Sequence, residues 1–92
     1  MDIRELEISE WVADKIASKH GIIAAEVYEV FWNDDDPLLI RRSQKVQGTY
    51  VALGRTFAGR YLMIAFRPLV EGRVKVLTAR DMDQRERPAY RE

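Results

Sequence analysis

The chain of 92 residues contains no cysteine and a single histidine, His20. Without cysteine the protein has neither disulfide bonds nor a thiolate metal site, and one histidine leaves too few ligands for a zinc site built from this chain alone. No hydrophobic run approaches the roughly 18 to 20 residues that span a bilayer, and residues 1–5 are mostly charged rather than apolar. We therefore expect a cytoplasmic protein without a membrane segment, a metal or an organic cofactor.

Hydrophobic residues make up 47% of the sequence and charged residues 33%, which is the balance of a folded globular protein. A chain of this length has room for one hydrophobic core only. The sequence predicts a single domain over residues 1–92.

The net charge of zero hides a strong asymmetry along the chain. Residues 1–36 sum to −7, whereas residues 37–80 sum to +8. A segment with this excess of cations is typical of a surface that meets phosphates or an acidic protein. Alternatively, the carboxylates of the first segment neutralise the cations of the second within the fold.

Apolar residues in the first part of the chain follow the period of an amphipathic helix. A first helix is predicted to start after Ser9, a favoured N-cap residue, and to stop at Gly21. A second helix is predicted from Ile23 to Phe31. A short C-terminal helix is predicted to begin at Asp83, because Asp83 and Glu86 have the spacing of a capping box.

After Pro37 the apolar period changes to two, the period of β-strands. Strands are predicted near residues 38–43, 49–55, 60–67 and 73–79. The links between them are short and contain glycine, which favours antiparallel hairpins over parallel crossovers. The third strand has apolar residues on both faces and is predicted to be central. The predicted fold class is α+β, with two N-terminal helices packed on a four-stranded antiparallel meander and a short C-terminal helix.

Three segments occur in an order and spacing that resemble the BrnT-like toxin family: Lys19-His20-Gly21, the hairpin from Gly54-Arg55 to Gly59-Arg60, and the tail from Thr78-Ala79-Arg80 to Glu86-Arg87 and Tyr90. The resemblance covers residues 8–91. It implies a fold similar to the RelE ribonucleases, cleavage of RNA without a metal, and neutralisation by a small cognate antitoxin, with a homodimer inside the complex as a further expectation. The chain departs from the family pattern at Ile16, where many members have an asparagine.

Cleavage of RNA by attack of a 2′-hydroxyl needs a base, cationic donors to the phosphate and an acid for the leaving oxygen. The predicted catalytic residues are Arg80, Arg60, His20 and Glu26. Each has a structural alternative. Arg80 could pair with a helix carboxylate, Arg60 could lie on a solvated hairpin edge, His20 could act as a helix cap or dipole partner, and Glu26 could be a solvated helix residue.

The predicted RNA-binding residues are Arg55, Arg67, Lys75, Tyr61 and Arg85. Arginine holds phosphate in a bidentate manner, and tyrosines on RNA-binding sheets stack on bases. Tyr50 is a further candidate for stacking. Alternatively, the tyrosines complete a core or an interface.

Two functions follow from the sequence. The first is a ribonuclease toxin of a toxin-antitoxin pair, which the arginine set favours. The second is a non-catalytic interaction module that keeps the same fold, which the near-zero net charge and the altered N-terminal motif favour.

Overall fold

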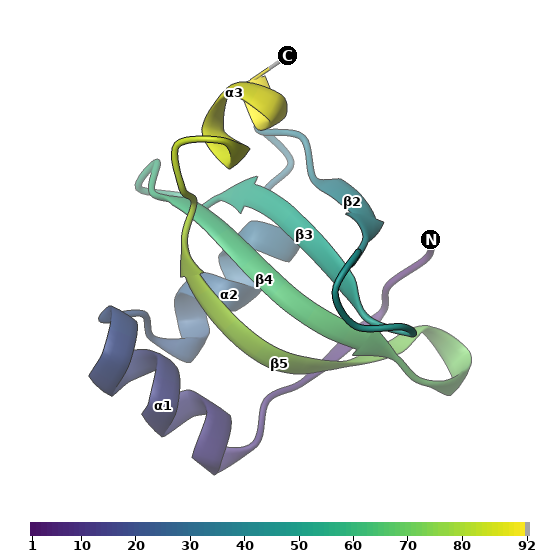
Figure 1. Ribbon diagram of the computed structural model, residues 1–92. Helices are drawn as coiled ribbons and strands as arrows, with labels where there is room; N and C mark the ends of the chain where they lie inside the picture. The colour runs from purple at the N-terminus through teal and green to yellow at the C-terminus, as the bar shows by residue number, and fades with distance from the viewer. Residues whose placement is uncertain (92) are drawn as a thin grey trace.

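The computed structural model describes residues 1–91 and follows the predicted order of helices and strands with one strand added (Figure 1). Glu92, the last residue of the predicted domain, lies outside the described residues. The elements are β1 (Glu5–Glu7), α1 (Glu10–His20), α2 (Ala24–Phe31), β2 (Leu39–Arg42), β3 (Tyr50–Arg55), β4 (Tyr61–Pro68), the 3-10 turn η1 (Val70–Gly72), β5 (Arg73–Asp81) and α3 (Glu86–Arg91).

Helix α1 begins and ends where its sequence predicts. The Oγ atom of Ser9 accepts a hydrogen bond from the backbone N–H of Val12 at 3.1 Å, which satisfies one free donor of the first turn. At the other end Gly21 has a φ of 64°, a left-handed conformation that glycine adopts at low cost. Both cap predictions are confirmed.

The strands form one sheet in the order β1-β5-β4-β3-β2. Strands β2 to β5 are antiparallel neighbours and β4 is central, as predicted. The prediction of a purely antiparallel four-stranded sheet was wrong, because β1 adds a parallel edge next to β5. In this pair Leu6 lies opposite Val74, and both side chains are buried. The long connection from β1 to β5 makes a parallel pairing possible.

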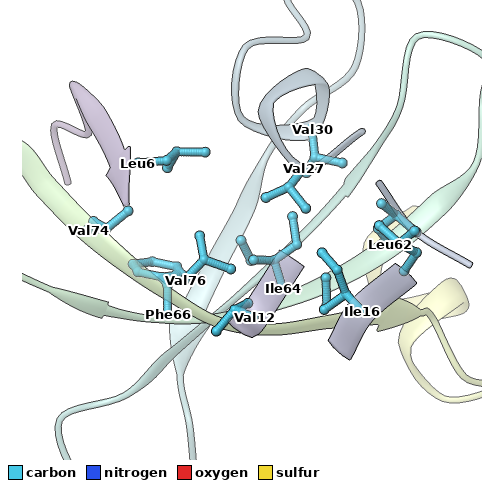
Figure 2. Packing of buried hydrophobic residues seen from close by; sticks show 13 residues of the cluster. Leu6, Val12, Ile16, Val27, Val30, Leu62, Ile64, Phe66, Val74 and Val76 are labelled. Atoms are coloured by element: carbon cyan, nitrogen blue, oxygen red, sulfur yellow. The ribbon is translucent and has the colours of Figure 1, made fainter. Parts of the chain in front are cut away.

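One face of the sheet, which we call the helix face, is covered by α1 and α2 (Figure 1). Figure 2 shows how side chains from both helices meet the side chains of β4 in one core. Ile64 and Phe66 from β4 are fully buried beside Ile16 of α1 and Val27 of α2. Burying a side chain of this size contributes roughly 1.5–3 kcal/mol, so this core is the main source of stability.

The opposite face, which we call the α3 face, is covered at one end only, by α3 (Figure 1). Tyr90 of α3 and Met82 pack there against Leu53 and Met63 of the sheet. The second small core holds the last helix on the sheet. Within residues 1–91, no helix has both the length and the apolar character needed to cross a membrane.

Candidate functional site

Three strands terminate at the same end of the sheet, which we call the arginine end. There β3 ends at Arg55 opposite Tyr61, the first residue of β4, and β5 ends at Asp81 opposite Leu62. The last turn of α1 and the start of α2 also reach this end. The structure thereby brings together six of the predicted site residues: His20, Glu26, Arg55, Arg60, Tyr61 and Arg80.

Arg60 lies at the centre of the arginine end on the helix face. Its Nε and Nη2 atoms donate to the two carboxylate oxygens of Asp81 at 2.8 and 3.1 Å. The remaining donors reach the backbone carbonyl oxygens of His20 and Gly21 at 2.9 and 3.0 Å, and the Glu26 carboxylate at 3.4 Å. Arg60 therefore ties the C-terminus of α1 to two strands, with 31% of its side chain exposed.

The ion pair of Arg60 and Asp81 shifts both groups toward their charged forms. The hydrogen bond from Arg60 lowers the pKa of Asp81, and the charges of His20 and Arg87 lower it further. The hydrogen bond to Asp81 raises the pKa of Arg60 in turn. Asp81 therefore stays ionised below the usual range of an aspartate.

His20 and Glu26, two of the predicted catalytic residues, both lie beside this ion pair. The backbone carbonyl of His20 accepts from Arg60, whereas its imidazole forms no hydrogen bond within residues 1–91. The carboxylate of Glu26 accepts from the backbone N–H of Ile23 at 3.1 Å and thus caps the start of α2. Glu26 is a structural cap as well as a partner of Arg60.

Arg80 lies on the other side of the sheet, opposite Met63 on the α3 face. Its two terminal nitrogens donate to the carboxylate of Glu86 at 2.8 and 2.9 Å, and a third bond reaches the carbonyl oxygen of Asp81 at 3.0 Å. Glu86 is buried, and its bond to Arg80 raises the pKa of that arginine. The ion pair with a helix carboxylate, the structural alternative for Arg80, is therefore present.

Glu86 also belongs to the capping box that the sequence predicts. Its carboxylate accepts from the backbone N–H of Asp83 at 3.0 Å, and Asp83 accepts from the backbone N–H of Glu86 at 2.8 Å. The prediction of this box is confirmed. Because the same carboxylate binds Arg80, the start of α3 and the end of β5 are linked through one side chain.

Tyr61 lies under two guanidinium groups on the α3 face. The Cζ atoms of Arg55 and Arg87 lie 4.8 and 4.4 Å from the centre of its ring. Tyr90 meets the same ring edge-on at a centroid distance of 6.0 Å. A nucleobase could stack on Tyr61 only by displacing one of these groups.

Arg55 has a carboxylate partner, whereas Arg87 has none in the described chain. Arg55 forms an ion pair with Asp36 at 3.4 Å. Among residues 1–91, no carboxylate lies within ion-pair distance of Arg87, and this residue is exposed. The guanidinium of Arg87 is therefore available to a ligand at this end.

The remaining predicted RNA-binding residues do not join this cluster. Arg67 and Lys75 face each other across β4 and β5, six positions along β4 from Tyr61, which is about 20 Å in a strand. Arg85 is exposed in the turn just before α3. Tyr50 stacks on Phe66 at 5.9 Å, so its role in the core is confirmed.

The sequence interpretation missed Asp81, Asp36 and Arg87. Asp81 pairs with a residue 21 positions away, and Asp36 with one 19 positions away, so no local pattern announces either contact. Arg87 belongs to the segment that resembles the BrnT-like family, and its positive charge was the sequence feature that could have indicated a role in the site. In the described residues, no group of three or more histidine, aspartate or glutamate side chains is arranged to hold a metal ion.

A separate surface on the helix face exposes aromatic side chains. Tyr28, Trp32 and Phe57 are 44%, 43% and 68% exposed. They line a shallow pocket of about 550 Å³ together with Glu29 and residues 4–6. We call it the aromatic pocket. Exposed apolar patches with polar rims are typical of protein interaction sites.

Comparison with known proteins places the fold but gives no sequence match. No protein-family model matches the chain, and a search of curated proteins found no match. The structure is similar to the 1.1 Å crystal structure of the Brucella abortus ribonuclease toxin BrnT, with a TM-score of 0.69 and 17% sequence identity. The similarity covers 87% of this chain and 97% of that chain. The chain therefore has the fold of the BrnT toxin, as its sequence motifs predict.

Proposed function

We propose that this protein is a ribonuclease toxin that cuts RNA at the arginine end without a metal. The observation that supports this most is that two groups of side chains reach one end of a BrnT fold from the two faces of the sheet. His20 and Arg60 lie on the helix face, and Arg55, Arg80 and Arg87 lie on the α3 face. Guanidinium groups suit the phosphate of a substrate because they donate two parallel hydrogen bonds. The Brucella abortus protein with the similar fold is a ribonuclease toxin.

The reaction is the attack of a ribose 2′-oxygen on the adjacent phosphorus, which expels the 5′-oxygen of the next nucleotide. Glu26 takes the proton from the 2′-hydroxyl and His20 gives a proton to the leaving 5′-oxygen. The products are a 2′,3′-cyclic phosphate and a free 5′-hydroxyl. Glu26 then releases its proton to water and His20 takes one from water, which restores both residues. Arg87 donates to the phosphate oxygens, where negative charge develops in the transition state.

RNA that binds at the arginine end competes with carboxylates that already pair with the arginines there. Arg60 donates to four acceptor groups of its own chain, so in this proposal it positions His20 and Glu26 rather than the phosphate. Arg80 is held by Glu86 in the same way. A phosphate reaches Arg80 only if Glu86 gives up one of its two bonds.

A second function, a non-catalytic interaction module, is favoured by the aromatic pocket and by the carboxylate partners of Arg55, Arg60 and Arg80. In both functions we propose a small antitoxin as the partner. In the first function the partner silences the enzyme. In the second, binding is the whole activity.

The test is expression of the protein with measurement of growth and of total RNA integrity. Growth arrest with RNA fragmentation supports the ribonuclease, and a folded protein that causes neither overturns it. The Arg80→Ala variant separates structure from chemistry when it is compared with the Arg80→Ala/Glu86→Gln double variant. The double variant removes the unpaired buried carboxylate and should regain stability. If Arg80 acts on RNA, activity stays lost in both variants.

A further inference from the structure

The hairpin that joins β2 and β3, far from the arginine end, encloses a polar pocket. The pocket has a volume of about 600 Å³. Its lining comes entirely from the hairpin: Arg42, Ser43, Gln44, Lys45, Gln47, Gly48, Thr49 and Tyr50. We call it the hairpin pocket. Neither the core nor the ion pairs described above use these side chains, apart from Tyr50.

In the described chain, the cations of the hairpin pocket have no carboxylate partners. Residues 37–70 contain six lysines and arginines but neither aspartate nor glutamate. Arg42 and Lys45 are exposed, and within residues 1–91 neither lies within ion-pair distance of a carboxylate. An anion that enters this pocket therefore displaces no internal partner, in contrast to the arginine end, where most guanidinium groups are already paired.

The hydroxyl groups of Thr49 and Ser43 belong to the lining as well. Thr49 is 6% exposed, and its Oγ1 atom has no hydrogen-bond partner in the described chain. A buried hydroxyl without a partner is uncommon, since its desolvation is not compensated. Ser43 accepts two backbone hydrogen bonds at Oγ, from Lys45 and Val46. Its hydroxyl proton therefore remains available to an acceptor.

We propose that the hairpin pocket binds a phosphate group of the RNA backbone, as a second contact remote from the site of cleavage. Its lining has two cationic, three hydroxyl-bearing and two amide side chains, and no carboxylate to repel an anion. The inference rests on the proposed function for the identity of the ligand as RNA. The chemistry of the pocket itself calls for a phosphate, whether free or in a nucleic acid chain.

The position of the pocket predicts a dependence on RNA length. Strand β3 runs from Tyr50 in the pocket lining to Arg55 at the arginine end, a distance of about 17 Å along the strand. One RNA strand reaches both places only if it spans this length. Oligonucleotides shorter than this distance gain no affinity from the hairpin pocket. Those long enough to reach it from the arginine end should bind more tightly.

Binding is measured with oligonucleotides that lack 2′-hydroxyls at the cleaved position and therefore remain intact. The variants are Lys45→Gln, Arg42→Gln and Thr49→Val. The charge-matched control is Arg4→Gln, because Arg4 lies outside the pocket lining and its guanidinium pairs with Asp2. Each charge variant should bind roughly tenfold more weakly. It should also lower the slope of log affinity against log salt by about 0.7, the value for one phosphate contact on a single strand. Arg4→Gln should change neither by a comparable amount.

The Thr49→Val variant distinguishes phosphate binding from a purely structural role of Thr49. Because the hydroxyl has no internal partner, its removal should leave the melting temperature unchanged or raise it, while RNA affinity falls. Equal affinity of Thr49→Val and the natural protein, together with equal salt slopes for Lys45→Gln and Arg4→Gln, overturns the proposal.

Inorganic phosphate is the second probe, followed by nuclear magnetic resonance of the backbone amides. Saturable shifts confined to residues 42–50, and lost in Lys45→Gln, support a phosphate site even if the protein fails to cut RNA, which separates this inference from the proposed function. If free phosphate moves these amides but long oligonucleotides do not, the assignment to RNA is wrong. If only an acidic protein partner moves them, the hairpin is a protein interface and the proposal fails.

Discussion

The guanidinium of Arg60 and the carboxylate of Asp81 meet side by side, with Nε–Oδ1 and Nη2–Oδ2 distances of 2.8 and 3.1 Å. This two-pronged contact joins the start of β4 to the end of β5. Through its other donors Arg60 also holds the carbonyl oxygens at the C-terminus of α1, which a helix leaves unsatisfied. One side chain thus fixes the helix that carries His20 to the strands that carry the arginines.

Replacing Arg60 by lysine should destabilise the protein even though the charge is kept. A lysine ammonium cannot donate two parallel bonds to Asp81 while reaching the end of α1. We expect a loss of about 1–2 kcal/mol for Arg60→Lys, reduced from the value for a buried pair because the site is partly exposed, and a larger loss for Arg60→Ala. In a domain of this size each kcal/mol lowers the melting temperature by roughly 4–8 °C. Equal melting temperatures for the natural protein and Arg60→Lys would show that the two parallel hydrogen bonds to Asp81 contribute nothing to stability.

Acid should weaken the same contact. The pKa of Asp81 is lowered in the folded protein, so its contribution to stability is complete above the unfolded value of about 3.9 and is lost as the pH falls through the lower folded value. The melting temperature should therefore fall on acidification below about pH 4. Asp81→Asn should make this fall less steep. Parallel pH profiles of the two proteins contradict the assignment of this acid sensitivity to Asp81.

The sequence predicted those parts of the fold that depend on local patterns. Helix α1 has its cap residues, Ser9 and Gly21, within its own segment, and β4 shows its central place through apolar residues on both faces. Strand β1 has three residues, too few for a period, and it exists because Leu6 is buried opposite Val74 in distant β5. Only the folded chain brings these two residues together.

The candidate site shows the same division. The placement of Arg55, Arg60 and Arg80 at one end of the sheet follows from the antiparallel order, because the end of β3, the start of β4 and the end of β5 lie side by side. The carboxylate partners could not be predicted, since Asp81 and Asp36 lie about twenty positions from the arginines they bind. Arg67 and Lys75 share strands with the site but lie at the far end, which charge counting along the chain does not distinguish.

Helix α2 approaches the sheet closely at Gly54. A methyl group added there would lie 2.7 Å from Cγ1 of Val30 and 3.3 Å from Cδ1 of Leu38. Both neighbours are packed, and Val30 is 1% exposed, so Gly54→Ala should cost about 1–3 kcal/mol by overpacking. The Gly54→Ala/Val30→Ala double variant should recover part of this loss, because the second change makes room for the added methyl. Denaturant unfolding of all four proteins measures this coupling, and simple additivity contradicts the close contact.

Tyr90 should contribute to stability through its hydroxyl as well as its ring. The hydroxyl donates to the carbonyl oxygen of Pro37 at 2.6 Å and so holds α3 against the loop before β2. Tyr90→Phe keeps the ring and removes this bond, for an expected loss of about 1 kcal/mol. Tyr90→Leu also removes the edge contact with Tyr61 and should cost more. Thermal melts rank the two variants, and a Phe variant as stable as the natural protein shows that the hydroxyl contributes nothing.

Replacing Arg87 gives the most direct test of catalysis at the arginine end. Arg55, Arg60 and Arg80 each pair with a carboxylate, whereas within residues 1–91 Arg87 does not. It is exposed, it lies over the ring of Tyr61, and no carboxylate in the described chain binds it. Arg87→Ala should therefore lower stability by no more than about 1 kcal/mol, the value of an exposed cation–π contact.

If Arg87 donates to the phosphate in the transition state, the same change should slow RNA cleavage by roughly a hundred- to a thousandfold. Arg87→Lys should restore part of the rate, because it keeps the charge but loses the bidentate geometry. Arg80→Ala differs in that both stability and activity should fall, since it leaves the carboxylate of Glu86 buried without its partner. Single-turnover cleavage measured beside thermal melts separates the two patterns. Full cleavage activity in Arg87→Ala would mean that the phosphate is held elsewhere, and the assignment of Arg87 to the site would be withdrawn.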